Sequence, residues 1–207
     1  MSKIYLLSNV KSNQEDIINL SVFDINFIKP TIDFNSYDAL IFTSKNAIFS
    51  LENFNIDYHK IPSYAIASKT ATILKTYNSN LVYTGVSGHG DQFANEIKEK
   101  LYGKKVLYVR AKKVVSNLTN ILKCEEVIVY ETVCKNQEKQ NKITKDSIII
   151  FTSPSTIKCF FSNYKWHDSY IAICIGKTTA SYLSKDIKYF ISNTTSIDSC
   201  IELARTI

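Results

Sequence analysis

The sequence predicts an α/β protein made of two similar domains, each with an open parallel sheet covered by helices on both faces. Short apolar runs alternate with segments of helical periodicity, which is the pattern of parallel strands joined by helices. An apolar run that ends in Phe-Thr-Ser and leads into a helix signal occurs twice, at 42–44 and at 151–153. The chain has 207 residues, 45% of them hydrophobic, which is enough for two cores of modest size.

The similarity between the two halves extends beyond these motifs. The 109 positions that separate Phe42 from Phe151 also separate Ala67 from Gly176 and Thr70 from Thr179. A second shift, of 102 positions, relates IYLLSN to VLYVRA and NFIKPTI to IVYETVC. A repeat of this length indicates duplicated domains, because solenoid repeats are only about 20 to 50 residues long.

The elements of the first half follow from local signals. Continuous apolar runs predict buried strands at 4–7, 39–42, 65–67 and 81–83, and an extended segment at 27–32 surrounds Pro30. Apolar residues at helical spacing predict helices at 13–20, 46–54 and 69–77. Ser44 is a suitable N-cap for the second of these helices, and Ser68 opens the third.

The second half repeats this alternation. Apolar runs predict strands at 106–109, 127–133, 148–151 and 171–175. Helices are expected at 155–161, at 178–183 and in the final segment SIDSCIELARTI. In both halves the Thr-Ser pair therefore lies where a parallel strand ends and a helix begins. That edge of an open α/β sheet is where ligands bind, and the free N–H groups of helix N-termini favour anions.

The common cofactor and nucleophile motifs are absent from the sequence. IGKTTA would be a phosphate-binding loop only with glycine at position 171, which is Ile171. The glycine-rich segment TGVSGHGDQF has Phe93 where the dinucleotide fingerprint needs its third glycine, so a βα turn is the simpler interpretation. Ser44 and Ser153 lack the G-x-S-x-G elbow of hydrolases, which leaves N-capping as their structural role.

The histidines and cysteines show no metal-binding pattern. The three histidines lie in separate predicted loops, and the five cysteines are scattered without a C-x-x-C motif. We therefore expect no metal site and no disulfide, and we expect reduced thiols in the cytoplasm. The N-terminal apolar run is too short for a signal peptide, and no run approaches the roughly 18 apolar residues of a membrane helix.

The net charge of +6 is compatible with an anionic partner. Nucleic acid and a phosphate or polycarboxylate ligand are both possible on this criterion alone. The densest basic stretch, 103–113, has an apolar centre and is typical of a strand with charged ends. The sequence also lacks aromatic residues interleaved with a basic stripe, which makes a nucleic-acid-binding module the weakest alternative.

The ordered set of motifs resembles the uroporphyrinogen-III synthase family. The resemblance rests on DALIFTSKNAI, AIASKTA, GKKVLYVRA, VIVYETV, IIIFTSPSTI and AICIGKTTA, and it extends from KIYLLS to the last helix. It implies two α/β domains joined by a two-stranded β-ladder. Residues 1–24 and 144–207 would form one domain, 37–124 the other, and 25–36 and 125–143 the ladder.

The resemblance also implies an activity. Members of the family close the linear tetrapyrrole hydroxymethylbilane with inversion of its last ring and loss of water, as lyases of haem biosynthesis that need no cofactor. The partner would be this octacarboxylate small molecule, with no nucleic acid and no membrane, and the protein would be a cytoplasmic monomer. The alternative from another class is a two-domain binding protein for an anionic small molecule, which would leave product composition unchanged.

Site residues are likewise implied by the resemblance. Tyr130 matches the tyrosine of the family's V-x-x-Y-x-T pattern and is the catalytic candidate, with simple packing in the ladder as its other possible role. The substrate-binding candidates are Ser44, Lys69, Thr70, Arg110, Ser153, Ser155, Lys177, Thr178 and Thr179. The chain departs from the family at Ser8-Asn9-Val10, where Thr-Arg-Pro is usual, and at Ala67, where glycine is usual. These departures leave open what the end of the first strand does.

Overall fold

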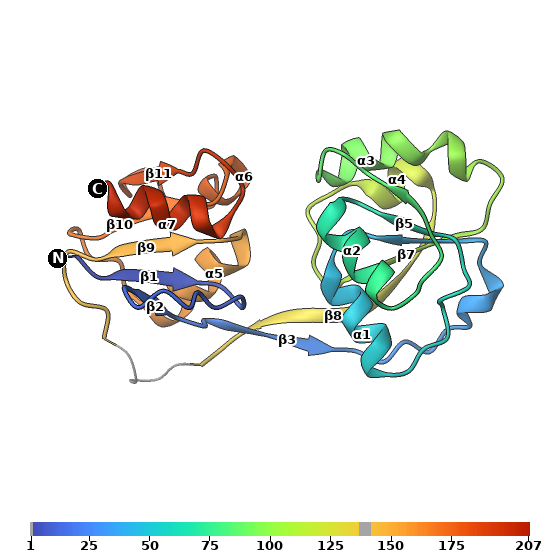
Figure 1. Cartoon of the computed structure of the whole chain (residues 1–207), viewed down its shortest axis with the longest axis horizontal. Helices are drawn as coiled ribbons and strands as arrows, with labels where there is room; N and C mark the ends of the chain where they lie inside the picture. The colour runs from blue at the N-terminus through green and yellow to red at the C-terminus, as the bar shows by residue number, and fades with distance from the viewer. Residues whose placement is uncertain (1, 137–141) are drawn as a thin grey trace. The chain divides into compact units, whose positions relative to one another are not determined.

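The computed structural model describes residues 2–136 and 142–207, and it divides the chain into two compact units (Figure 1). Unit 1 comprises Met1–Asp24 and Thr132–Ile207, and unit 2 comprises Ile25–Glu131. The chain therefore leaves unit 1 after Asp24 and returns to it after Glu131. The predicted limits of the domains and of the connecting ladder stay a prediction, and residues 137–141 of the second connector lie outside the described residues.

Unit 1 is a parallel sheet with the strand order β11-β10-β9-β1-β2. Its strands are β1 (Ile4–Leu7), β2 (Ile17–Asn19), β9 (Ile148–Phe151), β10 (Ile171–Cys174) and β11 (Tyr189–Ile191). Its helices are α5 (Pro154–Asn163), α6 (Lys177–Ala180) and α7 (Ile197–Arg205). Cys200 and Ile201 of α7 pack on one face of the sheet, whereas Phe160 of α5 contacts Phe151. The strands β1 and β9 are buried at every position, as expected of a sheet covered on both faces.

Unit 2 is a sheet with the order β3-β8-β7-β4-β5-β6. Its strands are β3 (Phe23–Phe27), β4 (Ala39–Phe42), β5 (Ser63–Ala65), β6 (Leu81–Thr84), β7 (Val106–Ala111) and β8 (Glu125–Cys134). Its helices are α1 (Lys45–Asn53), α2 (Ser68–Thr76), α3 (Gly90–Ile97) and α4 (Leu118–Leu122), with 3₁₀ turns η1 (Phe34–Ser36) and η2 (Glu99–Leu101). Helices α1 and α2 share one core cluster with the sheet, and α3 and α4 share the other.

The strands β4 to β8 all run parallel to their neighbours among these five, but β3 runs antiparallel to β8. Two backbone hydrogen bonds show this direction, because Ile28 pairs with Val129 whereas Val22 pairs with Lys135. Both strands cross the boundary between the units in the sequence. Among the described residues, no helix combines the length and apolar composition that a bilayer span requires.

The two sheets share an order of five strands. The series β11-β10-β9-β1-β2 of unit 1 corresponds to β6-β5-β4-β7-β8 of unit 2. The shift of 109 positions relates β4 and β5 to β9 and β10, and the shift of 102 relates β1 to β7. In each unit the Phe-Thr-Ser motif begins with the last residue of the central strand of these five strands, and its serine caps the helix that follows.

The prediction of a helix at 13–20 is wrong. Residues 17–19 form β2, which pairs with β1 in parallel register, with Ile4 opposite Ile17. The side chain of Asn19 accepts from Ser12 N and donates to Ser12 O, both at 2.8 Å, and so closes the preceding loop. Pairing with β1 satisfies the backbone and buries Ile17, whereas Ile18 stays exposed. This tertiary pairing overrides a weak helical periodicity.

The expectation that all five cysteines stay reduced is also wrong. Cys134, at the end of β8, forms a disulfide with Cys159 of α5, with a Cα–Cα distance of 4.9 Å. The two residues are 25 positions apart and meet only because the chain returns to unit 1 after Glu131. Cys124, Cys174 and Cys200 remain free thiols, and burial raises the pKa of Cys174 to about 12. Burial also raises the pKa of Cys124 and Cys200, so the reactive thiolate form is disfavoured in all three.

Candidate functional site

The predicted residues of unit 2 gather at the carboxyl edge of its sheet. Parallel pairing places the ends of β5, β4 and β7 side by side, with Phe42 opposite both Ala65 and Val109. Ser44 follows β4, Lys69 and Thr70 lie in the first turn of α2 after β5, Arg110 lies at the end of β7, and Tyr130 lies on the neighbouring β8. Lys69 is exposed and Thr70 is buried.

Tyr130 is buried, with 7% of its surface exposed, and the Ser44 side chain lies near its hydroxyl group. Burial raises the pKa of Tyr130 above 10.0, and the nearby Tyr108 acts in the same direction, while the hydroxyl group of Ser44 acts in the opposite direction. The hydroxyl group is therefore protonated at neutral pH. In that state Tyr130 can donate a hydrogen bond to a leaving oxygen.

A bulge in β8 sets the direction of Tyr130. Arg110 and Ala111 are neighbours on β7, yet they pair with Ile128 and Tyr130, so Val129 is an extra residue. Strict alternation would send Val129 and Tyr130 to opposite faces of the sheet, but both lie in the same core cluster. The carbonyl group of Val129 accepts from Ser50 Oγ of α1 at 2.5 Å and from Ile28 N at 2.7 Å, which holds the bulge in place.

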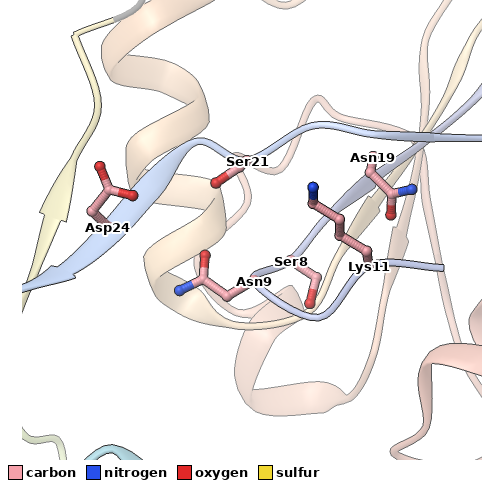
Figure 2. A pocket seen from close by; sticks show the side chains of 6 residues that line it. All are labelled: Ser8, Asn9, Lys11, Asn19, Ser21 and Asp24. Atoms are coloured by element: carbon pink, nitrogen blue, oxygen red, sulfur yellow. The ribbon is translucent and has the colours of Figure 1, made fainter. Parts of the chain in front are cut away.

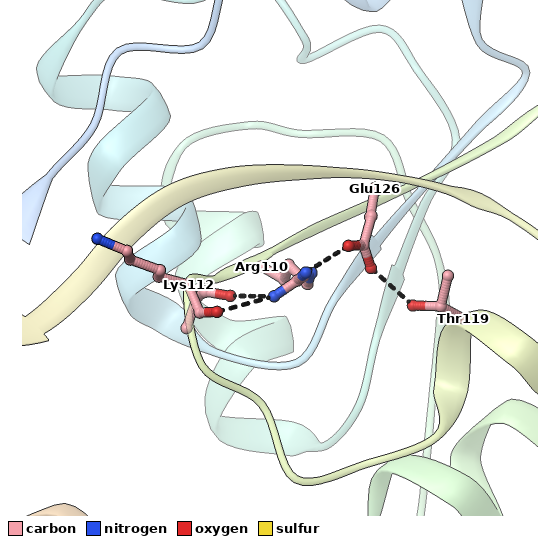
Figure 3. A network of polar contacts seen from close by, with 5 residues as sticks. Arg110, Lys112, Thr119 and Glu126 are labelled. Atoms are coloured by element: carbon pink, nitrogen blue, oxygen red, sulfur yellow. Dashed lines mark hydrogen bonds and ion pairs between the residues drawn. The ribbon is translucent and has the colours of Figure 1, made fainter.

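The guanidinium group of Arg110 forms hydrogen bonds and an ion pair with other groups of unit 2 (Figure 3). Its Nη2 pairs with Glu126, and its Nη1 donates to the carbonyl oxygens of Ala111 at 2.7 Å and Lys112 at 3.2 Å. Glu126 also accepts from Thr119 Oγ1 at 2.9 Å, and its pKa is lowered, chiefly by Arg110. These contacts join β7, β8 and α4, so Arg110 has a structural role that the sequence does not reveal.

This arrangement predicts that Arg110→Lys destabilises the protein more than it weakens substrate binding. A lysine lacks the planar guanidinium group that here donates to one carboxylate and two carbonyl groups at once. We expect the free energy of unfolding to fall by about 1–2 kcal/mol, since a partly buried set of hydrogen bonds is lost. Urea denaturation measures this loss, and the KM of the same variant serves as the control. A higher KM at unchanged stability would instead assign Arg110 to the substrate.

The predicted residues of unit 1 gather at the corresponding edge of their own sheet. Ser153 caps α5 in a reciprocal capping box with Thr156, and Ser155 lies in the first turn of that helix. Lys177, Thr178 and Thr179 form the start of α6, after Gly176, with the first two exposed and Thr179 buried. The ten predicted residues therefore fall into two groups of five, one in each unit.

A further cavity lies at the same edge of unit 1, and sequence reasoning missed it (Figure 2). It measures about 340 Å³ and is lined by Ser8, Asn9, Lys11, Asn19, Ser21 and Asp24. Ser8 and Asn9 directly follow β1, so their position at a strand end was the available signal. The incorrect helix at 13–20 concealed it, because a helix would have removed Asn19 from this edge.

Comparison with known proteins agrees with the resemblance. The family model for uroporphyrinogen-III synthase HemD matches residues 9–202. No curated protein matches the chain. The crystal structure of uroporphyrinogen-III synthetase from Helicobacter pylori 26695 is similar, with a TM-score of 0.86 and 31% sequence identity, covering 100% of this chain and 99% of that one. A match over nearly the whole length, in both sequence pattern and fold, identifies the relationship: the chain belongs to the uroporphyrinogen-III synthase family.

Proposed function

We propose that this chain closes hydroxymethylbilane to uroporphyrinogen III and that the hydroxyl group of Tyr130 assists the departure of water. As a member of its family, the chain is a cyclising enzyme of tetrapyrrole biosynthesis. The observation that carries the role of Tyr130 is its buried, protonated hydroxyl group, held beside Ser44 at the ligand-binding edge of a parallel sheet.

The reaction begins with loss of the terminal hydroxyl group of the substrate. Tyr130 would donate a hydrogen bond to that oxygen as the carbon–oxygen bond breaks, and the oxygen leaves as water after gaining a proton. The remaining azafulvenium cation is attacked by the last pyrrole ring to give a spiro intermediate. Fragmentation and recombination of this intermediate invert the ring, and loss of a proton restores the aromatic pyrrole.

Positioning is the larger part of this task, because the linear substrate also closes without the enzyme and then gives the uninverted isomer. The enzyme must hold the last ring so that the inverted product forms faster. Ser44, Lys69 and Thr70 in unit 2, and Ser153, Ser155, Lys177, Thr178 and Thr179 in unit 1, would bind substrate carboxylates. The N-termini of α1, α2 and α5 support this role, because their first N–H groups have no partners within the helix.

We extend the proposal to the partner and the place of action. The octacarboxylate substrate would be the only ligand that the reaction requires, and the protein would act as a monomer in the cytoplasm. The net charge of +6 supports the attraction of such a substrate.

The test supplies freshly generated hydroxymethylbilane and separates the porphyrin isomers after oxidation. Added protein should shift the product from isomer I to isomer III, with no cofactor and with undiminished activity in chelator. Heat-denatured protein is the control for the uncatalysed closure. An unchanged isomer ratio would overturn the proposal and leave an anion-binding protein.

A further inference from the structure

The cavity at the end of the first strand has the chemistry of an anion-binding pocket. It lies where β1 and β2 end and where the chain continues toward β3, and polar side chains line it from all three segments (Figure 2). Ser8, Asn9, Asn19 and Ser21 are neutral, and Lys11 is the only cation in the lining. The hydroxyl group of Ser8 and the amide group of Asn9 can donate hydrogen bonds to a ligand, whereas Ser21 Oγ already donates to the carbonyl oxygen of Phe23. A volume of about 340 Å³ has room for a carboxyl-bearing side chain of a ligand.

The loop that carries Lys11 is fixed at both ends. Ser8 is buried, and its Oγ accepts from Val10 N at 3.0 Å. On the other side of Lys11, the Asn19 side chain holds the backbone N–H and carbonyl groups of Ser12. Lys11 therefore has a stable backbone while its long side chain remains free to adjust to a ligand.

The charges around the cavity favour an anion. Asp24 is the only acidic residue in the lining, and its carboxylate group pairs with Lys135 at 3.1 Å. Among the ion pairs of the described residues, none involves Lys11. The charge of Asp24 is thus neutralised by Lys135, which lies outside the lining. The positive charge of Lys11 therefore remains available to a ligand.

The cavity also adjoins residues that we propose to bind substrate carboxylates. Leu7, the last residue of β1, is opposite Phe151 of β9, and Thr152 Oγ1 donates to the carbonyl oxygen of Leu7 at 2.8 Å. The next residue is Ser153, the cap of α5. An anion in the cavity would therefore belong to the same edge of the unit 1 sheet.

We infer that this cavity is a carboxylate-binding subsite in which Lys11 provides the charge, and that it takes one acidic side chain of the linear tetrapyrrole. The inference rests on the proposed function for the identity of the ligand, but the pocket itself is defined by its own residues. It also assigns a role to the end of the first strand, where the chain departs from the family pattern.

The test compares Lys11→Met with Lys11→Arg and with Lys3→Met. Lys3 is an exposed lysine just before the amino end of the same strand, at the opposite edge of the sheet, so its replacement removes the same charge away from the cavity. Two quantities are measured: KM and kcat with hydroxymethylbilane, and the Kd of the unreactive octacarboxylate uroporphyrin III by fluorescence titration.

For Lys11→Met we expect KM and Kd to rise about five-fold with little change in kcat, because an ion pair open to solvent is weak. Lys11→Arg should restore most of the affinity, and Lys3→Met should leave both constants unchanged. Unchanged constants in Lys11→Met, or an equal rise in Lys3→Met, would overturn the inference. The porphyrin titration reports on the pocket even if the protein makes no isomer III, so failure of the subsite is distinguishable from failure of the proposed function.

Discussion

Tyr130→Phe should lower turnover by roughly ten-fold or more, because an assisting proton donor contributes about 10²–10⁴ in rate. The substitution keeps the ring, which lies in the core cluster of α1 and α2, and removes only the hydroxyl group. Product binding should change little, since the loss of one neutral hydrogen bond costs only about 0.5–1.5 kcal/mol. The measurement is kcat for isomer III formation beside the Kd of uroporphyrin III.

The neighbouring strand offers a matched control. Tyr108 of β7 is also buried, and its hydroxyl group is 2.8 Å from Thr43 Oγ1, in the residue before Ser44. Tyr108→Phe also removes a tyrosine hydroxyl group near the carboxyl edge of this sheet, and it should lower turnover no more than several-fold. Ser153→Ala and Thr179→Ala should also lower turnover only several-fold, because in our proposal backbone N–H groups would still hold the substrate carboxylate. Near-full turnover in Tyr130→Phe, with loss of activity in any of these controls, would show that the roles are wrongly assigned.

The pH dependence provides a second check on Tyr130. Its folded-state pKa is raised above 10.0, so the neutral hydroxyl group is the favoured form, and this contribution to stability is lost only as pH rises through that raised value. The ratio of wild-type to Tyr130→Phe turnover should therefore be constant between about pH 6 and 9. A ratio that falls within this range would mean that the hydroxyl group of Tyr130 loses its proton there, which would contradict its raised pKa.

Reduction of the disulfide between Cys134 and Cys159 should lower the free energy of unfolding of unit 1 by about 2–4 kcal/mol. The bond closes a loop of 25 positions and ties the end of β8 to α5, which limits the freedom of the unfolded chain. The single tryptophan, Trp166, lies in unit 1 and contacts Phe160, the residue after Cys159. Its fluorescence during urea denaturation therefore reports on unit 1 rather than on the whole chain.

The controls for this experiment are two cysteine variants. Cys134→Ala should unfold at a low urea concentration whether or not reductant is present, because it cannot form the bond. Cys124→Ala removes a free thiol in unit 2 and should retain the full response to reductant. Identical curves for the wild type with and without reductant would contradict the expected stabilisation. In the reducing cytoplasm that we propose, the reduced protein sets the relevant stability.

Local signals in the sequence were sufficient for the central part of each sheet. The apolar runs at 39–42 and 148–151 became β4 and β9 with the expected bounds, since four consecutive apolar residues suit a strand that is covered on both faces of its sheet. Ser44 and Ser153 became N-caps because a serine hydroxyl group satisfies a backbone N–H within three residues of itself. These interactions depend on near neighbours, so they can be read from a short stretch of sequence.

The tertiary structure decided the features that depend on distant partners. The strand at 17–19 required β1 beside it, and the cysteine pair required the return of the chain to unit 1. The direction of Tyr130 required a bulge that Ser50 and Ile28 stabilise, and the fork of Arg110 required Glu126 on another strand. The sequence by itself determined the strand-to-helix junctions after β4 and β9, because the apolar runs and serine caps that define them are local. Contacts between residues far apart in the chain decided which side chains lie at the carboxyl edge of a sheet. They also decided which side chains are already bonded to other residues of the protein.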